Sequence, residues 1–469
     1  MKFRALHLIR RVAILPLISL AASHAADPVA SQTKPNILII LADDLGYADL
    51  GCQGSTDVKT PNIDSIAANG VRCTAGYVTA PQCSPSRAGL MSGRYQQRFG
   101  HEGNPNFPLM LMGGGRTIAD HLKGAGYATG HFGKWHLGFS DLGSAPRKIR
   151  ESKDQMLPTQ HGFDESFGYP EYAKVAKKGS DIAPSPHAHD DRVFARKAAD
   201  FIQRHREQPF FICLALHAPH YQQVDFGGFK QRFSDATKDR LGVLSAMAQQ
   251  DDAVGQVQQA LRDSALEERT LIFFISDNGG TRWPEVPPDS KHVRGSMNTP
   301  FSGHKGTALE GGIRVPFLVQ WKGHLPAGKT YGRPVSTLDV LPTALKVTGS
   351  LVAVDSAKAE ATLDGVNLLP FLRGEDSADP HEALFWRWRA EQAIRVGDWK
   401  LVRGKEQKPW RLIDLSHDEK EQHDLTARHP ERAKELLNRF EKWASALPPV
   451  GPSFKDTTEG EDESASLKK

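Results

Sequence analysis

The sequence is poor in cysteine and contains no long apolar run. Four cysteines in 469 residues are too few for a disulfide framework, although a bridge between Cys52 and Cys73 stays open. No segment reaches the ~20 consecutive apolar residues that cross a bilayer, which argues against a transmembrane anchor. Internal repeats are also lacking, so nothing indicates a solenoid or another repeat architecture.

Outside the first 25 residues, positive and negative charges are balanced. Basic residues there precede a short apolar core, Val12 to Leu20, and small residues offer a cleavage point near Ala25. This pattern predicts a secretory signal peptide over residues 1–25. Its removal takes away four positive charges and no negative one, which brings the formal net charge from +4 to zero. We therefore expect a secreted or periplasmic protein with no general attraction to nucleic acid.

Strand and helix patterns alternate through most of the chain. Short apolar runs predict buried parallel strands at 35–41, 127–132, 210–216 and 270–275. Helical patterns lie between them, at 61–70, 86–91, 117–122, 190–206 and 236–262. This alternation predicts the α/β class, with a large, mostly parallel sheet that helices cover on both faces.

The pattern changes near residue 376. Short antiparallel strands are predicted at 384–388, 392–403 and 410–415, and a helix follows at 430–446. We expect a main domain over 33–375, a small α+β subdomain with an antiparallel sheet over 376–450, and a polar tail without fixed structure over 451–469.

Two predicted strands end in oxygen-donor side chains followed by glycine. Asp43 and Asp44 follow the first strand, and Asp277 and Asn278 follow the strand at 270–275. An isolated pair of this kind most often caps a strand end or forms an Asx-turn. Sites in α/β sheets form beyond the carboxyl ends of strands, and hard divalent cations prefer oxygen ligands. Two such pairs in one chain therefore favour a metal site.

The segment CSPSRAGLMSGR, from Cys83 to Arg94, resembles the motif of the type I sulfatase family, which belongs to the alkaline phosphatase superfamily. The alternative, a plain thiol before a proline turn, loses weight because the match extends well beyond C-x-P-x-R. The resemblance implies that a maturase acts on the CSPSR segment and oxidises Cys83 to formylglycine. The hydrated aldehyde is a nucleophile that can expel sulfate without an attack of water on sulfur. It also implies an alkaline-phosphatase-like core.

Further segments resemble the same family and carry site residues with them. ILADDLGYADLGCQG and FISDNGG match its metal-binding segments, which implies Ca²⁺ bound by Asp43, Asp44, Cys83, Asp277 and Asn278. GKWHLG, HAPH and HKGTALEGGIRVP imply roles for basic residues around the sulfate: Lys134 and Lys305 as sulfate ligands, His136 as the proton acceptor, His217 near the leaving oxygen and Arg87 beside the formylglycine. A serine that some sulfatases use between GKWHLG and HAPH has no assignment here.

Residues that contact the substrate are less specifically marked. FGHE resembles segments of bacterial polysaccharide sulfatases and makes His101 a candidate sugar ligand, with His187 and His189 in PHAH as two more. Tyr221, Trp283 and Trp410 could stack on sugar rings. Loop histidines are often only solvated, and tryptophans often pack in the core.

These observations predict an enzyme that hydrolyses sulfate esters of a carbohydrate or polysaccharide. One alternative is a phosphodiesterase or phosphonate hydrolase of the same superfamily, which assays on aryl phosphates and aryl sulfates would distinguish. Another is a sulfated-glycan binding protein in which Cys83 is never converted, which mass spectrometry of the Cys83 peptide would reveal.

Overall fold

The computed structural model describes residues 34–103, 116–138, 157–168, 190–220, 228–281 apart from 234 and 237, 295–349, 363–404 and 408–449. The predicted signal peptide and the predicted C-terminal tail lie outside these residues. Among the described residues, no helix combines the length and the apolar character needed to cross a membrane.

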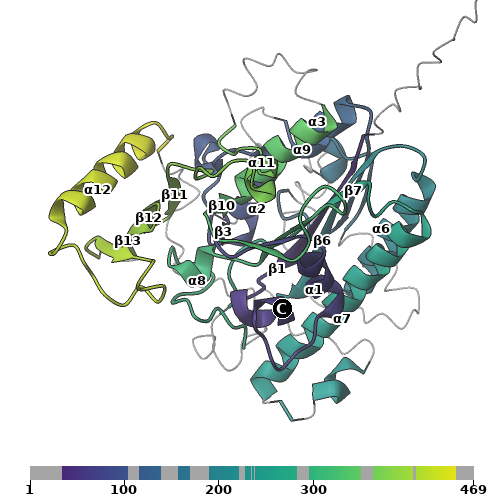
Figure 1. Ribbon diagram of the computed structural model, residues 1–469, viewed down its shortest axis with the longest axis horizontal. Helices are drawn as coiled ribbons and strands as arrows, with labels where there is room; N and C mark the ends of the chain where they lie inside the picture. Colours follow the sequence, from purple (N-terminus) through teal and green to yellow (C-terminus); the bar gives the residue numbers. More distant parts are fainter. Residues whose placement is uncertain are drawn as a thin grey trace, which may run out of the picture. The chain divides into compact units, whose positions relative to one another are not determined.

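A large sheet organises the main part of the chain (Figure 1). Within the described residues its strand order is β5-β4-β6-β1-β7-β8-β2-β9. The strands are β1 (Asn36–Asp43), β2 (Val71–Cys73), β4 (Ala128–Gly133), β5 (Glu165–Phe167), β6 (Phe210–Pro219), β7 (Thr270–Ser276), β8 (Phe317–Gln320) and β9 (Lys329–Tyr331). The five from β5 to β7 run parallel, and β8 is antiparallel to both of its neighbours. The predicted mostly parallel sheet is confirmed.

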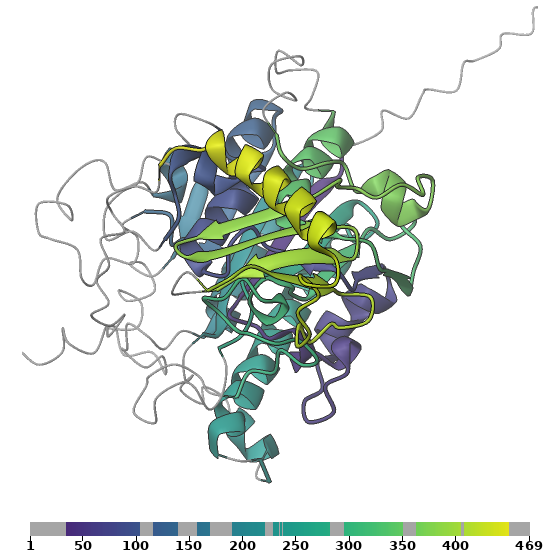
Figure 2. The same ribbon diagram turned by 90° about the vertical axis from the view of Figure 1, so that its left-hand side faces the viewer.

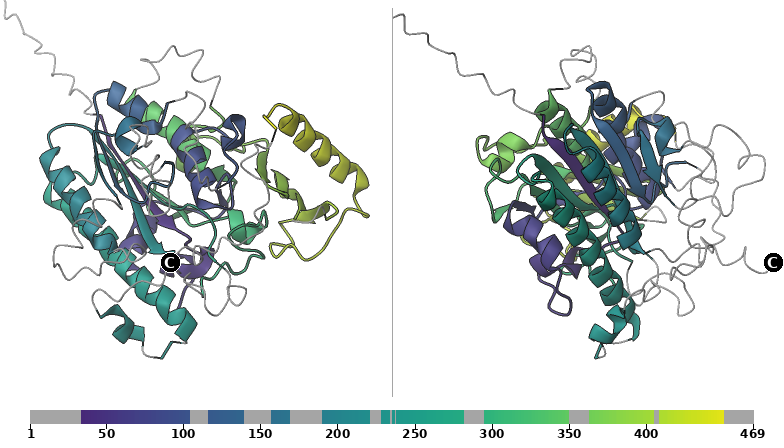
Figure 3. Two further views of the ribbon diagram at one scale, coloured as in Figure 1. Left: turned by 180° about the vertical axis from the view of Figure 1, so that it is seen from behind. Right: turned by 90° about the vertical axis from the view of Figure 1, so that its right-hand side faces the viewer.

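Helices cover both faces of this sheet, which explains why its central strand is apolar throughout. Ile37, Ile39 and Leu41 of β1 face the core under α2 (Cys83–Ser92), α3 (Ile118–Gly124) and α9 (Val340–Thr348). Leu38 and Ile40 face the core under α1 (Pro61–Ala68), α6 (Asp191–Arg204) and α7 (Lys238–Asp263). Figure 3 shows α6 and α7 side by side on the second of these faces of the sheet. A strand buried on both sides needs no polar alternation.

The C-terminal part forms a separate antiparallel sheet, as predicted. Its strands are β11 (Leu384–Trp388), β12 (Glu391–Val396), β13 (Trp399–Arg403) and β14 (Arg411–Asp414). The predicted single strand at 392–403 is wrong: it folds as two strands because Gly397 adopts a left-handed φ of 59° and turns the chain. Helix α12 (Pro430–Ser445) lies across the sheet (Figure 2) and packs through Leu436 and Phe440.

A buried lysine links this sheet to the main part. The ammonium of Lys400 on β13 lies 2.8 Å from Glu310 and 2.8 Å from Glu421. Lys400 and Glu310 are 0% exposed. Glu310 begins the short helix α8 (Glu310–Ile313), which lies beside the four-stranded sheet in Figure 1. The ammonium of Lys400 offsets the charge of both buried carboxylates, and Arg314 lies 3.5 Å from Glu310 as a second cation.

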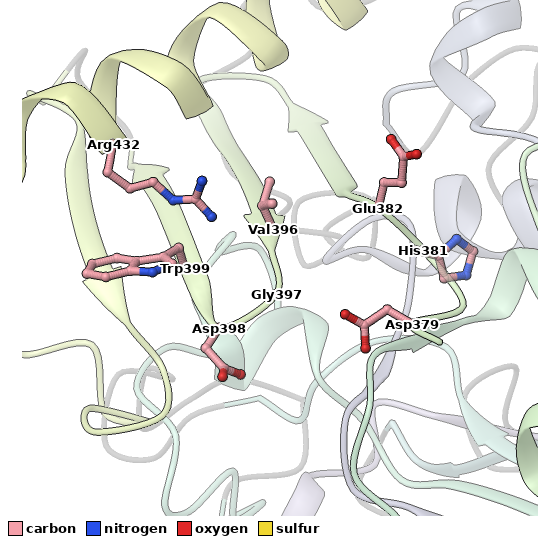
Figure 4. Close-up of a pocket in the computed structure, with 8 residues that line it drawn as sticks. All are labelled: Asp379, His381, Glu382, Val396, Gly397, Asp398, Trp399 and Arg432. Carbon is pink, nitrogen blue, oxygen red and sulfur yellow. The ribbon is translucent and has the colours of Figure 1, made fainter. Parts of the chain in front are cut away.

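A hollow of about 490 Å³ opens at the far end of the same sheet (Figure 4). It is lined by Asp379, His381, Glu382, Val396, Gly397, Asp398, Trp399 and Arg432. Its carboxylates already have arginine partners, among them Asp379 with Arg333 at 2.6 Å. The turn between β12 and β13 lines the hollow, so the hollow lies at the end of β12 that is opposite to Glu391. None of its lining residues is among the predicted catalytic residues.

We predict that Lys400→Met lowers the free energy of unfolding by roughly 3–5 kcal/mol. The change removes the cation that lies between two buried carboxylates, and leaves Glu310 with its longer ion pair to Arg314 at 3.5 Å. Chemical denaturation measures the change, and the exposed Lys434→Met on α12 is the matched control. Adding Glu310→Gln to Lys400→Met should recover part of the loss. A Lys400→Met effect no larger than that of the control would contradict this account.

We also predict a pH-dependent contribution from His381. Burial lowers its pKa, but the carboxylate of Asp339 at 2.9 Å outweighs burial and holds the pKa above its usual value. The protonated ring therefore stabilises the fold fully below the unfolded pKa of about 6.5, and this stabilisation is lost as pH rises through the folded pKa. The difference in unfolding free energy between the wild type and His381→Gln should shrink as pH rises. A difference that stays constant with pH would refute this assignment.

Candidate active site

The candidate site lies where four adjacent parallel strands, β4, β6, β1 and β7, reach their carboxyl ends. Asp43 is the last residue of β1, and Asp44 follows with a left-handed φ of 63°. Asp277 and Asn278 follow β7, and the backbone N–H of Asp44 donates to Asp277 Oδ1 at 3.2 Å. Parallel pairing of β1 with β7 in register, from Asn36 opposite Thr270 onward, brings the two acidic segments together.

Helix α2 places Cys83 beside this cluster. Its Sγ lies 3.4 Å from Asp43 Oδ1 and 3.7 Å from Asp44 Oδ1. The helix starts at Cys83, three residues before the predicted start, because Pro85 is tolerated in a first turn, where its missing N–H has no helical partner. Cys83 is therefore held by a helix and not by a loop, and the positive end of the helix dipole faces the carboxylates.

Three cations surround the carboxylates, each from a different segment. Arg87, one turn along α2, lies 2.7 Å from Asp277 and donates to the backbone carbonyl of Lys134 at 2.6 Å. Lys134, which follows β4, donates to Asp43 Oδ2 at 2.7 Å. Lys305, in the loop before α8, donates to Asp44 Oδ2 at 2.8 Å. The cluster is thus a buried array of alternating charges.

Burial and neighbouring charges shift the acids of the cluster in opposite directions. Burial raises the pKa of Asp43, but His220, Lys134 and Arg87 outweigh it and hold the pKa well below its usual value. Burial and the charge of Asp43 raise the pKa of Asp277 to about 7, against the effect of Arg87. Burial and Asp277 also raise the pKa of the Cys83 thiol well above its usual value. One further positive charge would relieve this crowding of acidic groups.

The residues present fit a divalent cation. Ligand atoms of Asp43, Asp44, Cys83 and His220 all lie within 4.8 Å of one another. The side-chain amide of Asn278 donates through Nδ2 to Asp44 Oδ1 at 2.7 Å, and its buried Oδ1 has no hydrogen-bond partner among the described residues. Oxygen donors suit Ca²⁺, whereas the sulfur of Cys83 and the nitrogen of His220 are softer ligands.

Two residues near the cluster were not predicted. One is His220, whose Nε2 lies 3.6 Å from Asp44 Oδ2. In the sequence, only its place as the last residue of the HAPH segment indicated a role. Asp191, the first residue of α6, is buried and accepts the backbone N–H groups of His217 and Ala218 at 2.8 and 2.9 Å. It holds the end of β6, and the amphipathic helix pattern gave no indication of this role.

The remaining predicted residues differ in their placement. His217 Nδ1 lies 3.4 Å from Asp43 Oδ2, beside the cluster. His136 follows Lys134 closely with a left-handed φ of 54°, and burial together with Lys134 and Arg87 lowers its pKa well below the usual value. His101 is buried, with Nε2 2.8 Å from Ser84 Oγ behind the first turn of α2. His187, His189, Tyr221 and Trp283 lie outside the described residues.

All four cysteines are free thiols, so Cys52 and Cys73 are not bridged. Cys213 is buried in β6, in the middle of the sheet. The site thus consists of a buried acidic cluster with surrounding cations, at the carboxyl ends of the parallel strands of an α/β fold.

Comparison with known proteins identifies the family. Residues 35–350 match the family model described as Sulfatase. N-acetylgalactosamine-6-sulfatase of Sus scrofa is 33% identical over 406 residues, which cover 78% of this chain and 71% of that protein. Arylsulfatase A of Homo sapiens is 32% identical over 430 residues, covering 82% and 76%. The chain belongs to the sulfatase family and is a sulfuric ester hydrolase.

Solved structures agree with this assignment. The crystal structure of Ps i-CgsB in complex with k-i-k-neocarrahexaose superposes with a TM-score of 0.77 at 31% identity, covering 93% of this chain and 98% of that one. The phosphonate monoester hydrolase of Agrobacterium radiobacter superposes with a TM-score of 0.61 at 21% identity, over 88% and 95% of the two chains. The second likeness shows a shared fold only.

Proposed function

We propose that this protein hydrolyses sulfate esters of a carbohydrate, with Cys83 converted to formylglycine and Ca²⁺ bound beside it. The observation that carries the proposal is the position of Cys83 at the start of α2, 3.4 Å from Asp43 and inside a ring of buried cations. Such a ring suits an ester whose charge grows as its bond to the leaving alcohol breaks.

Asp43, Asp44, Asp277, Asn278 and residue 83 would hold the metal. Conversion of Cys83 replaces its sulfur with oxygen, which would make this set of donors one of oxygens alone, as Ca²⁺ prefers. When bound, Ca²⁺ supplies positive charge that polarises a sulfate oxygen and lowers the pKa of the hydrated aldehyde. The buried Oδ1 of Asn278 supports this assignment, since it accepts no hydrogen bond from the part of the chain that the structure describes.

The basic residues would hold the sulfate and move protons. Lys134 and Lys305 donate to Asp43 and Asp44, the same two carboxylates that Cys83 Sγ contacts, so both ammonium groups lie near residue 83. His217, positioned by Asp191, would protonate the leaving oxygen, and His136 would take the later proton whose loss lets sulfate leave residue 83. Arg87 would fix the orientation of Asp277 and of the loop that carries Lys134.

The substrate would be a sulfated saccharide met outside the cytoplasm. Two similar proteins support this: one is named N-acetylgalactosamine-6-sulfatase, and one solved structure is a complex with k-i-k-neocarrahexaose. The predicted signal peptide agrees with a secreted or periplasmic enzyme, matured by a formylglycine-generating enzyme. His101, His187 and His189 remain proposed sugar ligands.

Phosphodiester or phosphonate hydrolysis is the alternative within the same superfamily, and the phosphonate monoester hydrolase of Agrobacterium radiobacter shares the fold. Sulfate is favoured because residues 35–350 match the Sulfatase family model, and because N-acetylgalactosamine-6-sulfatase of Sus scrofa is 33% identical to this chain, against 21% for the phosphonate hydrolase. A binding protein without activity would not need an oxidisable cysteine among metal ligands.

We predict that Cys83→Ala abolishes sulfate release from an aryl sulfate and from sulfated oligosaccharides, by at least roughly a thousandfold, because it removes the nucleophile. Ion chromatography of sulfate measures the loss. Cys52→Ala, at a free and partly exposed thiol, is the matched control and should retain activity. Equal activity of the two variants would overturn the proposal, and faster turnover of aryl phosphates than of aryl sulfates would favour the phosphoester alternative.

We predict that Ca²⁺ binds with a measurable heat and stabilises the fold by about 2.7 kcal/mol at a free concentration a hundredfold above its Kd. Isothermal calorimetry and thermal unfolding provide readouts that do not depend on activity. Asn278→Ala should weaken binding, whereas Asp263→Asn, at an exposed position at the end of α7, should not. The absence of both heat and stabilisation in the wild-type protein would count against a calcium site.

A further inference from the structure

The β11–β12 hairpin reaches the candidate active site from the C-terminal sheet. On one side, Glu391 accepts the backbone N–H of Ala308, three residues after Lys305, at 2.9 Å. On the other side, Gln97 in the segment after α2 donates to the backbone carbonyl of Arg387 at 2.9 Å. The turn of the hairpin is therefore held between the loop that carries Lys305 and the chain that leaves the Cys83 helix.

An aromatic ring of this hairpin lies against the Lys305 loop. A β-carbon added to Gly306 would lie 3.6 Å from Cη2 of Trp388, so the edge of the indole lies directly beside Gly306. Trp388 is 4% exposed, whereas Arg389 is exposed. The guanidinium carbon of Arg389 lies 5.0 Å from the centre of the Trp388 ring. A chain of contacts thus runs from Lys305 through Gly306 and Trp388 to an exposed cation.

The backbone at Arg389 is unfavourable for arginine. Its φ of 56° is left-handed, a conformation that glycine or asparagine adopts more easily in a two-residue hairpin turn. Asp44 and His136 of the candidate site share this feature. Residues kept in this conformation against their preference cluster at functional sites. Among the described residues Arg389 has no ion-pair partner, so local charge pairing does not explain an arginine here.

We propose that Arg389, stacked on Trp388, binds a second anionic group of the substrate, a sulfate or carboxylate on the sugar next to the one that is cleaved. This inference rests on the proposed function and narrows its substrate to a saccharide with at least two negative charges. A planar guanidinium binds either anion through two hydrogen bonds. Stacking on Trp388 orients it in advance, which lowers the entropy lost on binding.

The test compares Arg389→Gly, Arg389→Lys and wild type on two disaccharides, one with a single sulfate and one with a second anionic group. Glycine removes the side chain and suits the left-handed turn, so the variant should unfold at no lower temperature than wild type. The ratio of kcat/KM for the doubly charged over the singly charged substrate should fall roughly tenfold in Arg389→Gly, mainly through KM. Arg389→Lys should restore part of it.

Arg206→Ala is the control. Arg206 is an exposed arginine just before the amino end of β6, whereas the candidate site lies at the carboxyl ends of the strands, and its removal changes the net charge equally. It should leave the ratio unchanged. Using a second sulfate in one arm and a uronate in another shows which anion is bound.

The proposed subsite would be refuted if the ratio of the two kcat/KM values were the same in Arg389→Gly as in wild type. That result includes the case in which kcat/KM falls equally on both substrates. Calorimetric binding of the doubly charged disaccharide separates this outcome from failure of the proposed function. If wild type released no sulfate from any ester, the proposed function would fail. The subsite would still stand if Arg389→Gly weakened binding of the doubly charged sugar, and would fall if binding were unaffected.

Discussion

The structure depends on the burial of three carboxylates, Asp43, Asp44 and Asp277, at the ends of two neighbouring strands. Each is at most 1% exposed, and like charges this close in a medium of low polarity repel strongly. They are stable only because Arg87, Lys134 and Lys305 lie within 2.8 Å of them. Since these cations come from α2, from the end of β4 and from the loop before α8, the carboxylates determine where three distant segments must meet.

The loop that carries Lys305 connects this cluster to the C-terminal sheet. It is fixed on the inner side by the ion pair of Lys305 with Asp44, and on the outer side by Lys400, which holds Glu310 five residues later. The hydrogen bond from Ala308 to Glu391 adds a third attachment. The antiparallel sheet therefore does more than extend the fold: it fixes the outer wall of the site and brings Arg389 to its edge.

Much of this could be predicted from residues alone, for identifiable reasons. Apolar runs that end in Asp-Asp and Asp-Asn-Gly predicted both the parallel strands and the meeting of their ends, because parallel strands share a carboxyl edge. The sequence pattern predicts the start of α2 three residues too late, because Pro85 suggests a helix boundary, whereas proline also suits a first turn. Asp191 and Arg389 could not be found, because their roles come from tertiary contacts that leave no pattern in the sequence.

The most direct test of the central claim relates activity to the chemical state of residue 83. Preparations with different degrees of maturation would be labelled with an aldehyde-specific reagent, and the aldehyde fraction at residue 83 quantified by mass spectrometry. The account predicts that the rate of sulfate release per molecule rises in direct proportion to this fraction and is zero when the fraction is zero. Undiminished sulfate release from protein whose residue 83 is entirely cysteine would contradict it.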